Sequence, residues 1–271
     1  MPFVAEPKRK EALDADLINA ALGDHAQRFH VEVLDTCEST STRLLDLAEA
    51  GAPSGTVVVC ERQTAGRGRR GRSWLSAPGA SLTFSLLWRF PPSPRSLAGL
   101  SLASGVAVAR ALEGMGAAGV GLKWPNDILV GDAKLGGILV ETLNDGGAQL
   151  AVIGIGLNVR LPRALATAIP TDAADLQSVM QTAPSRNLLL ANLLRELDAM
   201  LSTFARTGFP AFIDAWLSRH AYSGRHVRIL AEGAAPLEGR CRDIDVDGAL
   251  LLDTGAGLRR VVSGEVSLRK T

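Results

Sequence analysis

Residues 63–74 read Gln-Thr-Ala-Gly-Arg-Gly-Arg-Arg-Gly-Arg-Ser-Trp and follow a β-branched stretch at residues 56–60 that is typical of a strand. Five arginines and one glutamate between positions 61 and 72 give the segment a formal charge of +4. Glycines let a backbone approach a ligand closely, and guanidinium groups bind oxyanions through two parallel hydrogen bonds. We therefore predict a loop that binds a chain of phosphates.

The same letters permit other interpretations. The G-x-G-x-x-G pattern at residues 66–71 resembles a dinucleotide fingerprint, which needs a following helix and an acidic residue about 20 positions later. Residues 75–79 are turn-rich instead, and residues 85–95 contain no carboxylate. A P-loop would need lysine in place of Arg72, and again a helix. Binding of nucleic acid by an Arg/Gly segment, or a solvated run of charge, is a third alternative. The segment has no neighbouring aromatic residue beyond Trp74 on which bases could stack, which argues against binding of nucleic acid.

The composition excludes several classes of protein. The 271 residues are 46% hydrophobic, enough for one large domain and one small one. A net charge of +1 gives no global signal for DNA, a membrane or an acidic partner. The three cysteines are far apart in the sequence, which argues against a disulfide scaffold or a structural zinc site. The four histidines form no metal-binding pair. The N-terminus lacks a secretory signal, and the uncharged run at residues 96–109 is too short to span a bilayer. We expect a cytoplasmic protein.

Hydrophobic periodicity outlines the fold on both sides of the loop. Strands are predicted at residues 30–35, 56–60, 81–88, 134–141 and 150–159, with two short strands inside 121–130. Helices are predicted at residues 14–22, 44–51, 96–115, 187–206 and 210–220. A hairpin signal, Asn-Asp-Gly-Gly at residues 144–147, favours a mixed, mostly antiparallel sheet and hence an α+β fold. Short strands and turns from residue 224 predict a small β-barrel of the SH3 type.

Polar and glycine-rich segments recur where these elements begin or end. Residues 38–42 offer four hydroxyl groups ahead of a helix, although an N-cap needs one. Residues 123–127 add an amide and a carboxylate on a turn. Lys134 precedes the glycine pair 136–137. Glycines normally weaken a strand, so this pair suggests that a ligand or another backbone comes very close there. Residues 154–158, Gly-Ile-Gly-Leu-Asn, repeat that theme. Together the segments predict a nucleotide-dependent enzyme that activates an acid.

The combination resembles the biotin protein ligases, also called biotin–acetyl-CoA-carboxylase ligases. Five motifs carry the resemblance in the family's order: Glu38-Ser39-Thr40, residues 63–74, Lys-Trp-Pro-Asn-Asp at 123–127, Lys-Leu-Gly-Gly-Ile-Leu at 134–139, and residues 154–158. The similarity covers about residue 31 to 271. It implies a short helical N-terminal extension (1–30), a class II synthetase-like biotin/lipoate ligase core that binds biotin and ATP (31–222), and an SH3-like barrel (223–271).

The resemblance also implies a reaction and a set of site residues. Biotin and MgATP would give biotinyl-5′-AMP and pyrophosphate, and biotin would then pass to one lysine of a biotin carboxyl carrier protein. The residues implied for biotin are Ser39, Thr40, Ser41, Gln63, Arg67, Gly68, Arg69, Lys134, Gly136 and Gly137. Those implied for ATP or the adenylate are Arg67, Arg69, Arg70, Arg72, Trp74, Asn126, Lys134 and Asn158, with Asp127 for magnesium.

The chemistry itself calls for such residue types. A carboxylate that attacks an α-phosphate brings two anions together, so fixed cations must neutralise the charge that grows in the transition state. Arg69 and Lys134 are suited to this catalytic role. The product is a reactive mixed anhydride from which water must be kept, so we expect the glycine-rich loop to close over the ligand as a lid.

Some features depart from the family or leave alternatives open. The family usually has asparagine where Ser41 stands, so a contact through that amide would be lost. About thirty residues precede the first predicted strand, too few for a DNA-binding domain with its own core; we expect no DNA binding, unlike in the family's repressor members. A lipoate or other acyl-protein ligase, and a binding module for RNA or phosphorylated ligands, remain alternatives. The sequence does not distinguish a monomer from a homodimer.

Overall fold

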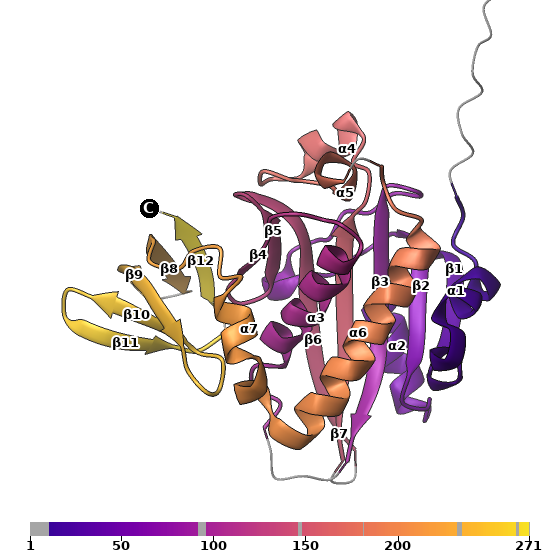
Figure 1. Cartoon of the computed structure of the whole chain (residues 1–271), viewed down its shortest axis with the longest axis horizontal. Coiled ribbons are helices and arrows are strands. Elements are labelled where there is room, and N and C mark those ends of the chain that lie inside the picture. The colour runs from indigo at the N-terminus through magenta and orange to yellow at the C-terminus, as the bar shows by residue number, and fades with distance from the viewer. Residues whose placement is uncertain are drawn as a thin grey trace, which may run out of the picture.

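The computed structural model describes residues 11–91, 96–145, 148–180, 182–231, 235–263 and 266–270 (Figure 1). The main unit contains a seven-stranded sheet in the order β1-β2-β3-β7-β6-β5-β4. Its strands are β1 (His30–Cys37), β2 (Thr56–Gln63), β3 (Ser81–Phe90), β4 (Val120–Lys123), β5 (Asp127–Val130), β6 (Ala133–Asp145) and β7 (Ala148–Asn158). Strands β1 and β2 pair in parallel, and the other neighbours pair antiparallel. The predicted α+β fold with a mostly antiparallel sheet is confirmed.

Helices cover both faces of this sheet because its strands alternate between two hydrophobic surfaces. On one face lie α1 (Ala15–Leu22), α3 (Leu100–Gly114), α6 (Arg186–Thr207) and α7 (Ile213–Leu217), and on the other lies α2 (Thr40–Glu49). Val57 and Val59 of β2 belong to the larger core with α3 and α6, whereas Val58 packs with Leu44 and Ala48 of α2. Figure 1 shows the sheet from the side of α3 and α6.

The C-terminal unit is a five-stranded antiparallel sheet in the order β11-β10-β9-β8-β12. Its strands are β8 (His226–Ala231), β9 (Leu237–Ile244), β10 (Leu250–Thr254), β11 (Gly257–Val261) and β12 (Val266–Lys270). It packs against the turn between β4 and β5, where the buried indole of Trp124 donates a hydrogen bond of 3.0 Å to the carbonyl of Gly248. This contact brings the two units together beside the segment 123–127.

Several predicted elements differ in their bounds. The helix predicted from residue 96 begins at Leu100, because Gly99 before it has a left-handed φ of 79°. The helix predicted at 210–220 is a 3-10 turn, Phe209–Phe212, followed by α7. The short helices α4 (Arg163–Ala168) and α5 (Leu176–Val179) were not predicted. Two further 3-10 segments, Gly23–Arg28 and Arg69–Gly71, complete the helical elements of the described residues.

The described part of the predicted N-terminal extension, from residue 11 on, packs into the main core. Ile18 and Leu22 of α1 are buried in the same hydrophobic cluster as α6. At the far end of β6 and β7, Gly146 and Gly147 of the predicted hairpin turn lie outside the described residues. Among the helices that the structure describes, none is long and apolar enough to cross a membrane.

Candidate active site

A cavity of about 1030 Å³ lies where the N-terminus of α2, the arginine-rich loop and the two structural units meet. We name residues 64–80, which connect β2 to β3, the arginine loop. The predicted site residues that line the cavity are Ser39, Thr40, Ser41, Gln63, Arg67, Gly68, Arg69, Arg70, Arg72, Trp74, Asn126, Asp127, Lys134, Gly137 and Asn158. The structure therefore gathers in one cavity residues that are up to 119 positions apart, from 39 to 158.

Gly136 is the exception among the predicted residues. A Cβ at this position would lie 2.5 Å from Cδ2 of Leu157 and 2.7 Å from the carbonyl oxygen of Gly156. Glycine is thus required there by the packing of β6 against β7, and Gly136 does not line the cavity. Its neighbour Gly137 does, and a Cβ on Gly137 would approach the ammonium group of Lys134 at 3.3 Å.

The hydroxyl cluster divides into a helix cap and a buried network. Ser39 is the N-cap of α2, and its Oγ accepts a hydrogen bond from the backbone N–H of Thr42 at 3.4 Å. Thr40 donates its backbone N–H to Oε1 of Gln63 at 2.8 Å, and its Oγ1 lies 2.9 Å from the hydroxyl of Ser85. The network holds the Gln63 amide with its oxygen turned toward α2, so the amide's orientation is fixed before a ligand arrives.

Ser41 extends this network along the cavity wall. Its Oγ lies 3.0 Å from Oγ of Ser85, and the side chain is buried. A Cβ on Gly154 of β7 would come within 2.6 Å of the same hydroxyl. Gly154 therefore makes room for the side chain of Ser41, a contact that the sequence did not predict.

The arginine loop contains an ordered hairpin at residues 66–74. The backbone N–H of Trp74 donates to the carbonyl of Gly66 at 2.8 Å, and that of Gly68 donates to Arg72 at 2.7 Å. At the tip, Arg70 has a φ of 58°, a conformation that is uncommon for residues with a side chain. The hairpin presents its arginines to the cavity from a defined backbone.

Two of these arginines reach other elements of the site. Arg67 forms an ion pair with Glu141 of β6, with Nη2 2.7 Å from Oε1. Arg69 donates a hydrogen bond of 3.4 Å to Oδ1 of Asn126. The hairpin is thus tied across the cavity to β6 and to the turn between β4 and β5.

The strongest electrostatic feature is Asp127 between two lysines. Nζ of Lys134 lies 2.5 Å from Oδ1 of Asp127, and Nζ of Lys123 lies 3.6 Å from Oδ2. Burial acts to raise the pKa of Asp127, but the two ammonium groups outweigh burial and hold this pKa below its usual range. Burial lowers the pKa of Lys123, against the raising effect of Asp127. One carboxylate faces two cations, so the cluster favours an anionic ligand.

Two buried polar atoms on the cavity wall are left without partners in the described part of the chain: the indole nitrogen of Trp74 and Oδ1 of Asn158. The Trp74 ring lies on Gly156, where a Cβ would come within 2.4 Å of it, and Lys134 is 5.9 Å from the ring centroid. Asn158 donates its amide to the carbonyls of Lys134 and Ala174. Buried polar groups are normally satisfied, so a ligand with both an acceptor and a donor fits this wall.

Sequence reasoning missed two parts of the site. Residues 168–173 line the cavity and are joined to Lys134, whose backbone N–H donates to Asp172 at 2.8 Å. Tyr222 and Arg269 reach the cavity from the C-terminal end of the chain, and the Tyr222 ring centroid is 5.5 Å from Nζ of Lys123. Residues 168–173 have no periodic pattern. Nothing local in the sequence indicates that Arg269 of β12 lies near Lys123 of β4. The Pro-Thr-Asp turn at residues 170–172, after a glycine-rich strand, was the available signal.

The described residues do not by themselves build a metal centre. Among them, no group of three or more His, Cys, Asp or Glu side chains could hold an ion. Mg²⁺ in nucleotide enzymes is commonly held by one or two carboxylates together with substrate phosphates. Asp127 fits the part of such a single carboxylate, with phosphate oxygens supplying other ligands.

Comparisons with known proteins point in one direction. Residues 33–158 match the biotin/lipoate A/B protein ligase family, and residues 222–269 match the biotin protein ligase C terminal domain. The bifunctional ligase/repressor BirA of Salmonella typhimurium is 38% identical over 97% of this chain and 80% of its own length. The biotin–[acetyl-CoA-carboxylase] ligase of Mycobacterium tuberculosis is 36% identical over 96% of this chain and 95% of its own.

Solved structures give the same result. The biotin protein ligase from Aquifex aeolicus, in complex with biotin and ATP, superposes with a TM-score of 0.76 at 31% identity. The similarity covers 89% of this chain and 99% of that one.

Proposed function

Since the chain belongs to the biotin protein ligase family, we propose that it is an ATP-dependent biotin–[acetyl-CoA-carboxylase] ligase. It makes biotinyl-5′-AMP and transfers biotin to a lysine of a biotin carboxyl carrier protein. The observation that carries the proposal is the single cavity in which a hydroxyl network, an arginine hairpin and the Lys134–Asp127 pair meet. Relatives named as biotin–[acetyl-CoA-carboxylase] ligases, and a relative's structure with biotin and ATP, support it.

The biotin ring system is assigned to the hydroxyl end of the cavity. Thr40, Ser41 and Gln63 offer donors and acceptors there that the Ser85 network already orients. Ser39 caps α2, which places its hydroxyl at the same end. We place Trp74, which the resemblance assigned to ATP or the adenylate, beside biotin: the apolar part of biotin would lie along the Trp74 ring over Gly156, which directs its carboxylate toward Lys134.

The adenylation step follows from the cations near Lys134. An oxygen of the biotin carboxylate attacks the α-phosphorus of ATP, the bond from that phosphorus to the β-phosphate oxygen breaks, and pyrophosphate leaves. Lys134 and Arg69 neutralise the charge that builds up on the phosphoryl oxygens. For this, Lys134 exchanges part of its contact with Asp127 for the ligand. When bound, Mg²⁺ would add positive charge at the phosphates, and Asp127 is the residue proposed to hold it.

The second step needs protection from water. The amine of the acceptor lysine attacks the biotinyl carbonyl carbon, loses a proton, and AMP leaves. Until then the mixed anhydride must be shielded, and the hairpin at residues 66–74, with Arg67 and Arg69, is placed to cover it. Asn158, with its unpartnered Oδ1, is proposed to accept a hydrogen bond from the adenylate. Arg70, Arg72 and Asn126 complete the proposed nucleotide side.

Biotin-dependent exchange of labelled pyrophosphate into ATP tests the proposal. We expect exchange with biotin and magnesium, and at least a hundredfold loss in Lys134→Ala and Arg69→Ala, since fixed charges of this kind contribute about 10²–10³ in rate. Lipoate and octanoate are tested beside biotin. Exchange with one of these acids, and none with biotin, would replace the substrate, and absence of exchange with every acid would refute the ligase.

The cellular setting follows from the same chemistry. Free Cys37, Cys60 and Cys241 suit a reducing compartment, and we place the enzyme in the cytoplasm. A net charge of +1 gives no broad basic surface for DNA, and we expect no specific, salt-resistant gel shift. Sedimentation with and without biotin and ATP will decide between a monomer and a homodimer.

A further inference from the structure

A buried ion pair lies next to the site but outside the cavity. Arg186, at the start of α6, donates from Nη1 and Nη2 to the two carboxylate oxygens of Glu61, both at 2.7 Å. The side chains are 5% and 13% exposed. Glu61 stands in β2 two residues before Gln63, whose amide belongs to the biotin end of the cavity. Burial acts to raise the pKa of Glu61, but the hydrogen bond from Arg186 and those from the backbone outweigh it.

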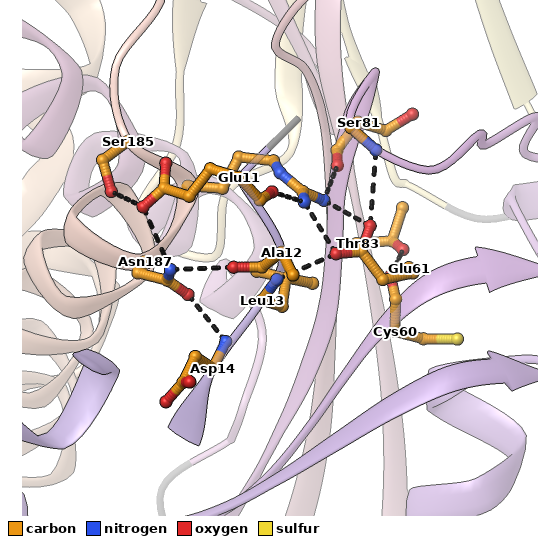
Figure 2. Close-up of polar contacts among 12 residues, drawn as sticks. Glu11, Ala12, Leu13, Asp14, Cys60, Glu61, Ser81, Thr83, Ser185 and Asn187 are labelled. Carbon is orange, nitrogen blue, oxygen red and sulfur yellow. Dashed lines mark hydrogen bonds and ion pairs between the residues drawn. The ribbon is translucent and has the colours of Figure 1, made fainter. Parts of the chain in front are cut away.

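The pair joins the two ends of the arginine loop. Glu61 precedes the loop, and its Oε2 accepts a hydrogen bond of 3.3 Å from the backbone N–H of Gly79 near the loop's end. Arg186 donates to the carbonyl of Ser81, the first residue of β3, at 3.4 Å. Figure 2 shows the carboxylate of Glu61 and the backbone of Ser81 converging on the same guanidinium group. One charged pair therefore fixes the base from which the hairpin at residues 66–74 projects.

The same pair holds the N-terminal segment. Leu13 donates its backbone N–H to Oε1 of Glu61 at 2.9 Å, and Arg186 donates to the carbonyl of Glu11 at 2.5 Å. The neighbouring Asn187 donates to the carbonyl of Ala12 at 3.0 Å and accepts from the backbone N–H of Asp14 at 3.0 Å (Figure 2). One set of hydrogen bonds thus joins the two ends of the arginine loop, the start of α6 and the segment before α1.

Resting on the proposed function, we infer that Glu61 and Arg186 are positioning residues that set the closure of the arginine loop over biotinyl-5′-AMP. Buried ion pairs add little net stability compared with apolar side chains of similar volume, and a role in specifying one geometry is their best-attested use. Here the geometry specified is that of a loop whose backbone must place Gln63, Arg67 and Arg69 around one ligand.

The effect of the pair separates from that of the reacting groups. At saturating biotin and ATP the bound ligands hold the loop closed and bring Arg69 to its place beside Lys134, so the turnover number of pyrophosphate exchange changes little. The closed loop becomes less populated, so KM for biotin rises and biotinyl-5′-AMP escapes faster from the enzyme. A residue that only stabilised the fold would lower the melting temperature and leave both quantities unchanged.

The variants are Glu61→Gln, which keeps the shape of the side chain, and Arg186→Lys, which keeps the charge but loses the two-pronged contact. The matched control is Asp198→Asn, which breaks another ion pair on α6, that of the buried Asp198 with the exposed Arg28 at 2.6 Å, away from the loop. KM and kcat of exchange, the rate of adenylate release, the melting temperature and trypsin cleavage within residues 67–72 of ligand-free protein are measured for each.

We expect Glu61→Gln and Arg186→Lys to raise KM for biotin and adenylate release about tenfold, with kcat of exchange within about threefold of the parent. Their loops should be cut faster by trypsin, and Asp198→Asn should match the parent in all but melting temperature. Variants that melt lower but equal the parent in KM, release and cleavage would overturn the inference. Because cleavage is read without ligands, faster cutting beside a parent that shows no exchange would refute the ligase and retain the positioning of the loop.

Discussion

Lys134 and Asp127 form an ion pair, with 2.5 Å between Nζ and Oδ1, inside the cavity where the proposed reaction takes place. Lys134 is thus held by a carboxylate before ATP is bound, and Lys123 lies on the other oxygen of Asp127. An ammonium group oriented in this way needs little rearrangement to meet a phosphate, and this is the kind of preorganisation on which electrostatic catalysis depends. Orientation of Lys134 is therefore to be separated from the contact with magnesium that we propose for Asp127.

Asp127→Asn tests these roles. The variant leaves two partly buried ammonium groups facing an uncharged amide, so we expect a loss of about 2–4 kcal/mol in the free energy of unfolding, measured by urea denaturation. If Asp127 also holds magnesium, the concentration of Mg²⁺ that gives half-maximal exchange rises at least tenfold. An unchanged magnesium dependence would confine Asp127 to the orientation of Lys134. Glu141→Gln, which removes the carboxylate paired with Arg67 at the rim, is the control.

Gly156→Ala tests the wall beneath Trp74. The added methyl group would lie 2.4 Å from the indole ring, so the ring must move away from the strand and into the cavity. We expect a shift in tryptophan fluorescence and a rise in KM for biotin of at least about tenfold, because the displaced ring takes up space in the cavity. Overpacking of this kind also lowers the free energy of unfolding by about 1–3 kcal/mol. Gly114→Ala at the end of α3 is the control, since a methyl group there would meet no described atom within 4 Å beyond its own helix and chain neighbours. Equal KM values for both variants would contradict the assignment of this wall to biotin.

The sequence predicted the local parts of this site better than the distant ones. Lys134, the arginine loop and the hydroxyl cluster carry unusual local chemistry, and each lines the cavity as expected. For Gly136 the sequence left open whether a ligand or another backbone comes close, because a glycine in a strand can serve either. Here the neighbour is Leu157 of β7.

Contacts between distant segments were beyond prediction. Arg269 reaches the cavity only because the C-terminal sheet docks on Trp124, and Arg186 meets Glu61 only because α6 crosses the sheet beside β2. The periodicity of the sequence predicts the apolar face of α6. It does not predict which strand Arg186, the first residue of α6, contacts. The strands and the longer helices were predicted because their patterns are local, whereas the pairing that turns them into a site is a property of the whole fold.

His220, between the two structural units, makes the stability of the fold depend on pH. Its ring is buried beside Trp216, 4.5 Å between centroids, and within the described residues its Nε2 has no hydrogen-bond partner. Burial lowers its pKa to about 4, although the charge of Asp243 acts in the opposite direction. Between pH 6.5 and 4, His220 is therefore protonated in the unfolded chain, where the pKa of histidine is about 6.5, and neutral in the folded chain. The stability due to neutral His220 is complete above pH 6.5 and is lost as pH falls toward 4.

His220→Phe should remove that dependence. Across this window we expect the parent to lose about 3 kcal/mol of unfolding free energy more than the variant does, since each pKa unit corresponds to about 1.4 kcal/mol. Urea denaturation at intervals from pH 7 to 4 gives the comparison. His30→Gln, which replaces a histidine at an exposed position in β1, is the control. Parallel curves for the parent and His220→Phe would show that protonation of His220 costs the fold nothing, and that the ring finds a partner for its proton without opening the contact between the units.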